Sequence, residues 1–237
     1  MSAAVRPRGH TATMSHRAVT PPGDLNFFPT PPWAGRAGAE LVKRLDPGAC
    51  SAWEPACGQG HMAEPLADYF DRVWASDVFG YGYGSVLDFL SAEADRAAGM
   101  SPDWIITNPP FDHIEAFITL ALRRARRGVA MLMRTTVREG QGRYRRLWST
   151  HPVSVIAPFA DRVPMFKHRF DPAGSTAAAY GWFVWLKPET GSPLIDLAEA
   201  ARRLTGEPSA AVEMIIPPGV RERLTLRRDL ERFRGRG

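Results

Sequence analysis

Short apolar runs alternate with amphipathic stretches along most of the chain. Four such runs predict buried strands, at 49–54, 72–76, 104–107 and 128–133. Apolar residues at helical spacing lie between the runs and predict helices at 33–45, 62–69 and 114–121. Strands that alternate with helices are typical of a parallel sheet covered on both faces, so we expect an α/β fold.

Two of these helices are preceded by polar residues that favour capping. Thr30 stands just before two prolines, which are tolerated in a first helical turn, and we expect Thr30 to cap the helix at 33–45. Asp112 and Glu115 form a pattern like a capping box ahead of the helix at 114–121.

The later part of the chain departs from the alternation. Apolar runs at 153–157 and 177–186 follow one another without an obvious helix between them, which predicts an antiparallel hairpin at one edge of a mostly parallel sheet. Residues 188–237 begin with a loop and a helix and number only 50, which is marginal for an independent domain. We therefore expect a flexible N-terminal tail at 1–24, a main domain at 25–187, and a helical, basic C-terminal extension at 188–237.

Composition narrows the class of protein. With 44% hydrophobic and 23% charged residues, the chain of 237 residues is close to an average globular protein. No apolar run approaches the roughly 20 residues that a membrane-spanning helix needs, so we expect no membrane partner. Two cysteines are too few for a disulfide scaffold or an all-cysteine zinc site, and no metal site is predicted.

Positive charge is concentrated in two segments. The net charge is +5, and 27 of the 30 basic residues are arginine, whose guanidinium group matches phosphate oxygens. Residues 123–146 hold nine arginines and one glutamate (+8), and residues 219–237 carry +4. This distribution favours a surface that binds nucleic acid, although a solvated helix face and loop is the alternative. The candidates for this surface are Arg134, Arg138, Arg143, Arg145, Arg146 and His168.

A glycine-containing turn follows the first predicted strand. The segment 54–60 reads Glu-Pro-Ala-Cys-Gly-Gln-Gly, and it would let a ligand approach the backbone at the start of a helix. Asp77, at the end of the next strand, could accept hydrogen bonds from ribose hydroxyls. The pair of features is typical of a nucleotide-binding fold, and a tight turn beside a solvated carboxylate explains it equally well.

A second motif follows the strand at 104–107. It reads Asn108-Pro109-Pro110-Phe111, and in an open α/β sheet it would face the same crevice as the glycine turn. The Asn108 side-chain oxygen and the Pro109 carbonyl could accept both hydrogens of one exocyclic amine. Phe111 offers a face on which a planar ring could stack. A rigid turn with a buried aromatic residue is the structural alternative.

Together these motifs resemble the amino-methyltransferases that use S-adenosylmethionine. Within that group they are similar to the DNA N6-adenine enzymes in which the cofactor motif precedes the catalytic one, and to compact phage-encoded members. The resemblance covers about residues 27–186. It implies a Rossmann-like class I methyltransferase fold, S-adenosylmethionine as cofactor and DNA as partner. It also implies a location in the cytoplasm of a bacterium or of a phage-infected host cell.

The resemblance also implies roles for individual residues. The expected catalytic residues are Asn108, Pro109, Pro110 and Phe111. The expected cofactor-binding residues are Thr30, Pro31, Glu54, Pro55, Ala56, Cys57, Gly58, Gly60, Asp77, Asp88 and Phe89. Segment 28–31 looks like the motif that contacts the methionine end of the cofactor. Asp77 matches the acidic ribose ligand, where many relatives place glutamate, and Asp88 matches the reader of the cofactor's adenine.

The implied reaction is direct methyl transfer to the N6 amine of adenine. The protein would align the amine with the methyl group, and the adenine would first be flipped out of the duplex. Methylation of RNA adenine or of protein glutamine uses similar Asn-Pro-Pro-aromatic loops and is one alternative. A noncatalytic nucleic-acid-binding module with the same fold is the other, and the intact Asn108 and Phe111 argue against it.

Overall fold

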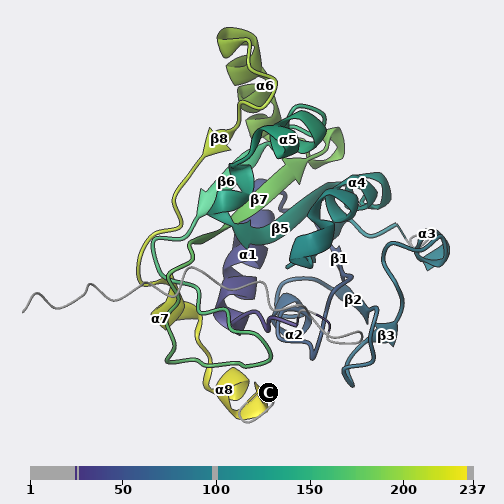
Figure 1. Cartoon of the computed structure of the whole chain (residues 1–237), viewed down its shortest axis with the longest axis vertical. Coiled ribbons are helices and arrows are strands. Elements are labelled where there is room, and N and C mark those ends of the chain that lie inside the picture. Colours follow the sequence, from purple (N-terminus) through teal and green to yellow (C-terminus); the bar gives the residue numbers. More distant parts are fainter. Residues whose placement is uncertain (1–24, 26, 98–100, 234–237) are drawn as a thin grey trace, which may run out of the picture.

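The computed structural model describes residues 25, 27–97 and 101–233. The predicted tail at 1–24 lies outside the described residues. The described part contains an eight-stranded sheet with the strand order β3-β2-β1-β4-β5-β7-β6-β8 (Figure 1). The strands are β1 (Ser51–Glu54), β2 (Arg72–Asp77), β3 (Ser85–Val86), β4 (Trp104–Thr107), β5 (Gly128–Arg134), β6 (Val155–Pro158), β7 (Tyr180–Leu186) and β8 (Val212–Glu213).

Helices connect the strands and cover the sheet. They are α1 (Pro32–Leu45), α2 (Ala63–Leu66), α3 (Glu93–Ala97), α4 (Ile114–Arg124), α5 (Gln141–Arg143), α6 (Pro193–Thr205), α7 (Val220–Leu224) and α8 (Arg227–Phe233). Shorter helical turns are η2 (Phe111–His113), η3 (Thr135–Arg138), η4 (Tyr144–Trp148) and η5 (Pro188–Thr190).

The expected α/β fold with a mostly parallel sheet is confirmed. Strands β3, β2, β1, β4 and β5 are parallel to one another, whereas β7 runs antiparallel to both β5 and β6. The predicted antiparallel pair is therefore β6 and β7. It does not form the outermost edge, because β8 pairs in parallel with β6 through Val155 and Val212.

Two apolar layers hold the helices on the sheet. On β5, Ala130 and Leu132 belong to the cluster that packs α1, whereas Val129 and Met131 belong to the cluster that packs α4. Successive side chains of a strand point to opposite faces, so a run that is apolar throughout fits a strand covered on both sides. This explains why the continuous apolar runs of the sequence become central strands.

Both expected helix caps differ in the structure. The residue that precedes α1 is Pro31, and within the described residues it is not accompanied by a side-chain cap. Before α4, residues Phe111–His113 form the turn η2, and again no side-chain cap is present. Glu115 instead accepts two hydrogen bonds from Arg146, a residue 31 positions away. The Glu115 side chain, which the local pattern assigned to a helix cap, therefore forms a long-range ion pair instead.

The residues after 188 return to the body of the protein. Helix α6 is largely exposed, with the apolar side chains of Leu197 and Leu204 open to solvent. Helix α7 packs against α1 (Figure 1), and α8 is joined to α1 by the ion pair of Arg36 and Asp229. Among the described residues, no helix combines the length and the apolar character that a membrane crossing requires.

The strand order places a crevice between β1 and β4. From β1 the chain extends the sheet through β2 and β3, and it then crosses back to β4 on the other side of β1. In an open α/β sheet, ligands bind outside the carboxyl ends of the strands where the order reverses. Glu54 ends β1 and Asn108 follows β4, so both predicted motifs meet at this switch point.

Candidate active site

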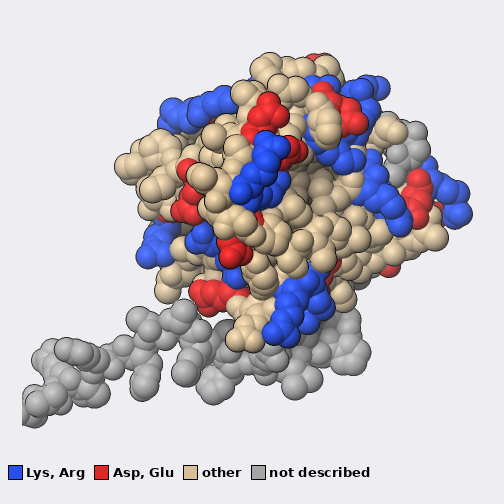
Figure 2. Space-filling model, turned by 90° about the horizontal axis from the view of Figure 1, so that it is seen from above, with Lys and Arg blue, Asp and Glu red and all other residues tan. Residues whose placement is uncertain are grey.

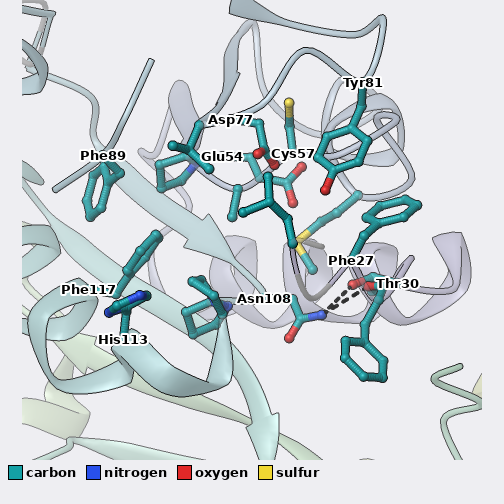
Figure 3. A pocket seen from close by; sticks show the side chains of 18 of the residues that line it. Phe27, Thr30, Glu54, Cys57, Asp77, Tyr81, Phe89, Asn108, His113 and Phe117 are labelled. Carbon is teal, nitrogen blue, oxygen red and sulfur yellow. Dashed lines mark hydrogen bonds between the residues drawn. The ribbon is translucent and has the colours of Figure 1, made fainter. Parts of the chain in front are cut away.

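A cavity of about 400 Å³ opens at the carboxyl ends of β1, β2 and β4 (Figure 3). This volume is in the range of small-molecule sites. The predicted residues that line it are Thr30, Glu54, Pro55, Ala56, Cys57, Asp77, Asp88, Phe89, Asn108, Pro109, Pro110 and Phe111. Three further predicted residues, Pro31, Gly58 and Gly60, are not among the lining residues. The fold thus brings the two predicted motifs to one cavity.

The turn after β1 is shaped by glycines and tied to β2. Gly58 has a φ of +50°, and a Cβ atom there would lie 2.3 Å from the Phe27 ring, so only glycine fits. The Gly58 N–H donates to Asp77 Oδ2 at 2.9 Å, and the Phe79 N–H donates to Asp77 Oδ1 at 3.1 Å. Gly58 therefore shapes the cavity through its backbone, and Asp77 is held in place at its wall.

Glu54 is a buried carboxylate at the bottom of this site. It is 2% exposed, and its Oε2 atom has no hydrogen-bond partner among the described residues. Burial raises the pKa of Glu54 well above its usual range, and repulsion from Asp77 raises it further, against one backbone hydrogen bond from Ala63. A carboxylate in this position lacks the cation that would compensate its desolvation, so it is suited to receive a ligand's ammonium group.

Two other groups beside the turn have altered acidity. Burial raises the pKa of the Asp77 carboxyl, although the backbone hydrogen bonds from Gly58 and Phe79 oppose the shift. Burial also raises the pKa of the Cys57 thiol, and the nearby carboxylates of Glu54 and Asp77 add to that effect. A thiol shifted upward stays protonated, so Cys57 is a small wall residue and not a nucleophile.

Asn108 presents its side-chain oxygen without a partner. Its Nδ2 donates to Thr30 Oγ1 at 3.2 Å and to the Phe28 carbonyl at 3.4 Å. Its Oδ1 is buried and accepts no hydrogen bond from the described residues. In Figure 3 this oxygen lies on the opposite side of the amide from Thr30. A buried acceptor without a donor is costly, so this oxygen is available to a ligand's N–H group.

Phe111 is held between a second aromatic ring and a cation. The Phe28 ring lies 5.1 Å from the Phe111 ring, and the Arg134 guanidinium lies 4.7 Å from its centroid. Arg134 in turn donates from Nε to the Tyr180 hydroxyl at 3.2 Å. The side chain at the end of β5 therefore contacts the Asn-Pro-Pro-Phe loop directly.

Asp88 and Phe89 differ in their surroundings. Asp88 is exposed, and its Oδ1 accepts a hydrogen bond from the Leu90 N–H at 2.8 Å. Phe89 is 1% exposed and packs edge-on against Trp53 at 5.3 Å, with Phe117 at 4.8 Å. Phe89 is thus both a core residue and part of the cavity wall.

Most arginines proposed for a phosphate-binding surface are paired with protein groups. Arg138 pairs with Glu213 at 3.1 Å, and Arg146 pairs with Glu115 at 3.0 Å. Arg143 donates to the Val137 and Glu139 carbonyls. Arg145 is exposed and makes no ion pair within the described part of the chain. Figure 2 shows the same pattern, with basic side chains in separate patches beside acidic ones.

The basic segment at 123–146 is also divided in space. Arg126 and Arg127 precede β5 and pair with Asp103 and Asp46, whereas Arg134 ends that strand. Seven extended residues span about 20 Å, so the two groups lie at opposite ends of the sheet. His168, the last candidate, has a φ of +57°, and its N–H donates to the Phe27 carbonyl at 2.8 Å.

The sequence did not predict an aromatic group at the rim of the cavity. Phe27 stacks on Tyr81 at 4.8 Å, and His61 stacks on Phe233 of α8 at 4.0 Å. Phe27, Tyr81 and His61 all line the cavity. The alternation of tyrosine and glycine at 80–84 was the available signal for Tyr81. Within the described ranges, no group of three or more His, Cys, Asp or Glu side chains is arranged to hold a metal ion.

No protein-family model and no curated protein matches the sequence. Similarity to solved structures is clear. The methyltransferase subunit of a type I restriction-modification system from Streptococcus thermophilus has 11% identity and a TM-score of 0.51, over 68% of this chain and 45% of that one. A structure described as a modification subunit of a type I restriction enzyme from Vibrio vulnificus YJ016 has 14% identity and a TM-score of 0.51, over 89% and 52%.

The chain spans about half the length of these structures. At such low identity the similarity concerns the fold. The expected Rossmann-like class I methyltransferase fold is confirmed.

Proposed function

We propose that this chain transfers a methyl group from S-adenosylmethionine to the N6 amine of adenine in DNA. One observation carries the proposal: the buried, unpartnered Oδ1 of Asn108 lines the same cavity as the buried Glu54 carboxylate. One end of the cavity is suited to an ammonium group and the other to an N–H donor. A methyl donor with an amino-acid part would place its ammonium group at the Glu54 end. A methyl acceptor with an exocyclic amine would place its N–H groups at the Asn108 end.

The residues present fit the proposed cofactor. The Glu54 Oε2 would accept a hydrogen bond from the cofactor's ammonium group, which would offset the desolvation of the carboxylate. Asp77, at the end of β2, would accept from ribose hydroxyls while it keeps its bonds to the turn. Asp88 and Phe89 line the part of the cavity proposed for the cofactor's adenine. When bound, S-adenosylmethionine would supply a methyl carbon activated by its sulfonium group, with the neutral thioether as the leaving group.

The chain's own contribution is to bind and orient the target amine. The Asn108 Oδ1 and the Pro109 carbonyl would accept its two hydrogens, which leaves the nitrogen lone pair directed at the methyl carbon. The nitrogen then releases one proton to water. Phe111 would stack on the flipped adenine, and the contacts of Arg134 and Phe28 keep its ring at the cavity mouth.

Two observations support a nucleic-acid substrate. Arg134 ends β5 next to the Phe111 ring of the Asn-Pro-Pro-Phe loop and is exposed, and Arg145, 11 residues further along the chain, is also exposed. An exposed guanidinium group that contacts a residue lining a base-sized cavity suits phosphate binding. The two similar structures are subunits of restriction systems, which is consistent with DNA as the polymer.

The direct test is methyl transfer from tritiated S-adenosylmethionine to separate pools of DNA, ribosomal RNA and protein. We expect label in DNA, and digestion of that DNA should yield N6-methyladenine. Label only in RNA would favour an RNA adenine methyltransferase, and label only in protein a glutamine methyltransferase. Cofactor binding without transfer to any pool would favour the noncatalytic binding module.

The Asn108→Ala variant tests the assigned chemistry. Removal of the acceptor oxygen should abolish transfer, whereas the dissociation constant of the cofactor should change by less than about threefold. The matched control is Thr107→Val, one residue earlier, because the Thr107 hydroxyl is buried and makes no hydrogen bond. A similar loss of cofactor affinity in Asn108→Ala would contradict the assignment of Asn108 to the target amine.

A further inference from the structure

The two ends of the Asn108 amide have opposite hydrogen-bonding chemistry. The NH₂ end donates only, and the oxygen accepts only. The Phe28 carbonyl lies 3.4 Å from one end, and a carbonyl can only accept, so that end must be the NH₂ group. The oxygen is thereby directed to the other side. The contact with Phe28 thus settles which end of Asn108 is available in the cavity.

Thr30 adds a second restraint to the same end. Its Oγ1 lies 3.2 Å from Asn108 Nδ2, and the threonine is 4% exposed. The hydroxyl stands at the start of α1, where a threonine ordinarily caps the helix, yet no side-chain cap is formed there. The hydroxyl instead serves as an acceptor for a residue 78 positions along the chain.

The backbone around Thr30 is suited to this task. Pro29 precedes Thr30, and two further prolines follow it, so the segment has few conformations available. The segment is buried from Pro29 onward and continues directly into α1. This rigid segment lies between α1 and the loop after β4, and it holds the Asn108 amide in one orientation. Little conformational entropy is lost, because the prolines already restrict the backbone.

We propose that the segment 28–30 positions Asn108, with Thr30 and the Phe28 carbonyl holding the acceptor oxygen toward the target amine. This inference rests on the proposed function and adds a role that the resemblance did not imply for Thr30, which it assigned to the methionine end of the cofactor. If the amide rotated by half a turn, its NH₂ group would face the amine of the substrate. Two donors would then meet, and the amine would lose its acceptor.

The chain is well suited to a direct measurement of this restraint. It has only two asparagines, Asn26 and Asn108, so protein labelled with ¹⁵N-asparagine gives two side-chain NH₂ signals. The signal absent from Asn108→Ala identifies Asn108. In the unaltered chain we expect its two protons to differ widely in shift and to exchange slowly with water, because both Nδ2 acceptors are in a buried environment.

Two substitutions at position 30 separate the hydroxyl from the shape of the side chain. Thr30→Val keeps the shape but removes the acceptor, so kcat should fall about 10-fold, the factor for a hydrogen bond worth about 1.4 kcal/mol. The cofactor dissociation constant should stay within threefold, and the Asn108 protons should exchange faster. Thr30→Ser keeps the hydroxyl and should restore both kcat and the slow exchange. Thr107→Val serves as the control with an unchanged signal and rate.

The outcomes distinguish this inference from the proposed function. Weaker cofactor binding with unchanged kcat in Thr30→Val would overturn the positioning role and favour a direct cofactor contact. Unchanged kcat together with an unchanged Asn108 signal would overturn it as well. An unaltered chain that methylates none of the pools would refute the proposed function and the catalytic role of the restraint. Slow exchange at Asn108 would even then identify the hydrogen bond itself.

Discussion

At the scale of single residues, the site keeps unsatisfied groups that cost stability. Glu54 is the clearest case, because burial and Asp77 raise the pKa of its carboxyl. A carboxyl whose pKa is raised by folding favours the folded state below the pKa of the unfolded chain. That contribution is lost as the pH rises through the folded-state pKa. Wherever Glu54 is ionised, its buried charge therefore opposes folding until a cation compensates it.

Glu54→Gln should consequently stabilise the cofactor-free protein. The amide keeps the shape of the side chain and removes the buried charge, and each 1 kcal/mol gained would raise the melting temperature by about 2–4 °C. The same change should weaken cofactor binding by at least 10-fold, because the ammonium group loses its counter-ion. Thermal unfolding with and without cofactor measures both effects. A variant that melts lower without cofactor would contradict this account of Glu54.

Cofactor binding should also depend on pH through the same carboxyl. An ammonium group beside Glu54 favours the ionised form and lowers its pKa, so binding should release a proton wherever free Glu54 is protonated. As the pH decreases from neutrality, affinity should therefore fall wherever free Glu54 is protonated. An α-amino group, with a usual pKa of about 7.7–8.0, stays charged over this range. Calorimetry in buffers of different ionisation enthalpy measures the released proton, and proton uptake would exclude this coupling.

At the scale of elements, α8 supports the site from outside the sheet. Arg36 of α1 donates to both carboxylate oxygens of Asp229, at 2.5 and 3.0 Å, and both side chains are buried. Phe233 of the same helix stacks on His61, which lines the cavity. The last helix therefore links the stability of the C-terminal segment to the shape of the cofactor end.

Asp229→Asn tests this link. Loss of one charge from a buried pair should lower the free energy of unfolding by about 2–4 kcal/mol and should weaken cofactor binding. Glu231→Gln makes the matched change on the same helix, at an exposed pair with Arg227, and should alter stability by less than about 0.5 kcal/mol. Denaturant unfolding and cofactor titration compare the two. Equal effects of the two substitutions would show that the buried pair has no special role.

The elements that the sequence predicted correctly are those set by local pattern. The run at 104–107 is the strand Trp104–Thr107, because its continuous apolar character fits only a strand covered on both faces. The helix expected at 62–69 is shorter, with α-helix only at Ala63–Leu66, and Pro65 within it limits its hydrogen bonding. Contacts over long sequence distances, such as Thr30 with Asn108 or Glu115 with Arg146, leave no local pattern and could not be predicted.

At the scale of the whole molecule, the arginines at 123–146 do not form the one continuous basic surface that their closeness in sequence suggests. The strand between Arg127 and Arg134 separates the arginines into two groups, and this division follows from the predicted strand at 128–133. The pairing of most arginines with acidic residues does not follow from sequence. Ion-paired arginines release fewer counterions from nucleic acid than free ones, because their charge is already compensated. DNA binding should therefore depend on few residues.

Arg145 and Arg123 make this expectation testable, because both are exposed arginines of the same segment. Arg145 has no ion pair among the described residues and follows β5 in the chain, whereas Arg123 donates to both oxygens of Asp95. If Arg145 contacts a phosphate, Arg145→Gln should reduce the slope of log Kobs against log salt by about 0.9 for duplex DNA. Arg123→Gln should leave the slope unchanged, although it alters the net charge equally. Titration of fluorescent DNA at several salt concentrations measures both slopes. Equal reductions of the slope in the two variants would mean that DNA binding responds only to the total charge of the protein. Other residues would then have to guide the target base into the cavity.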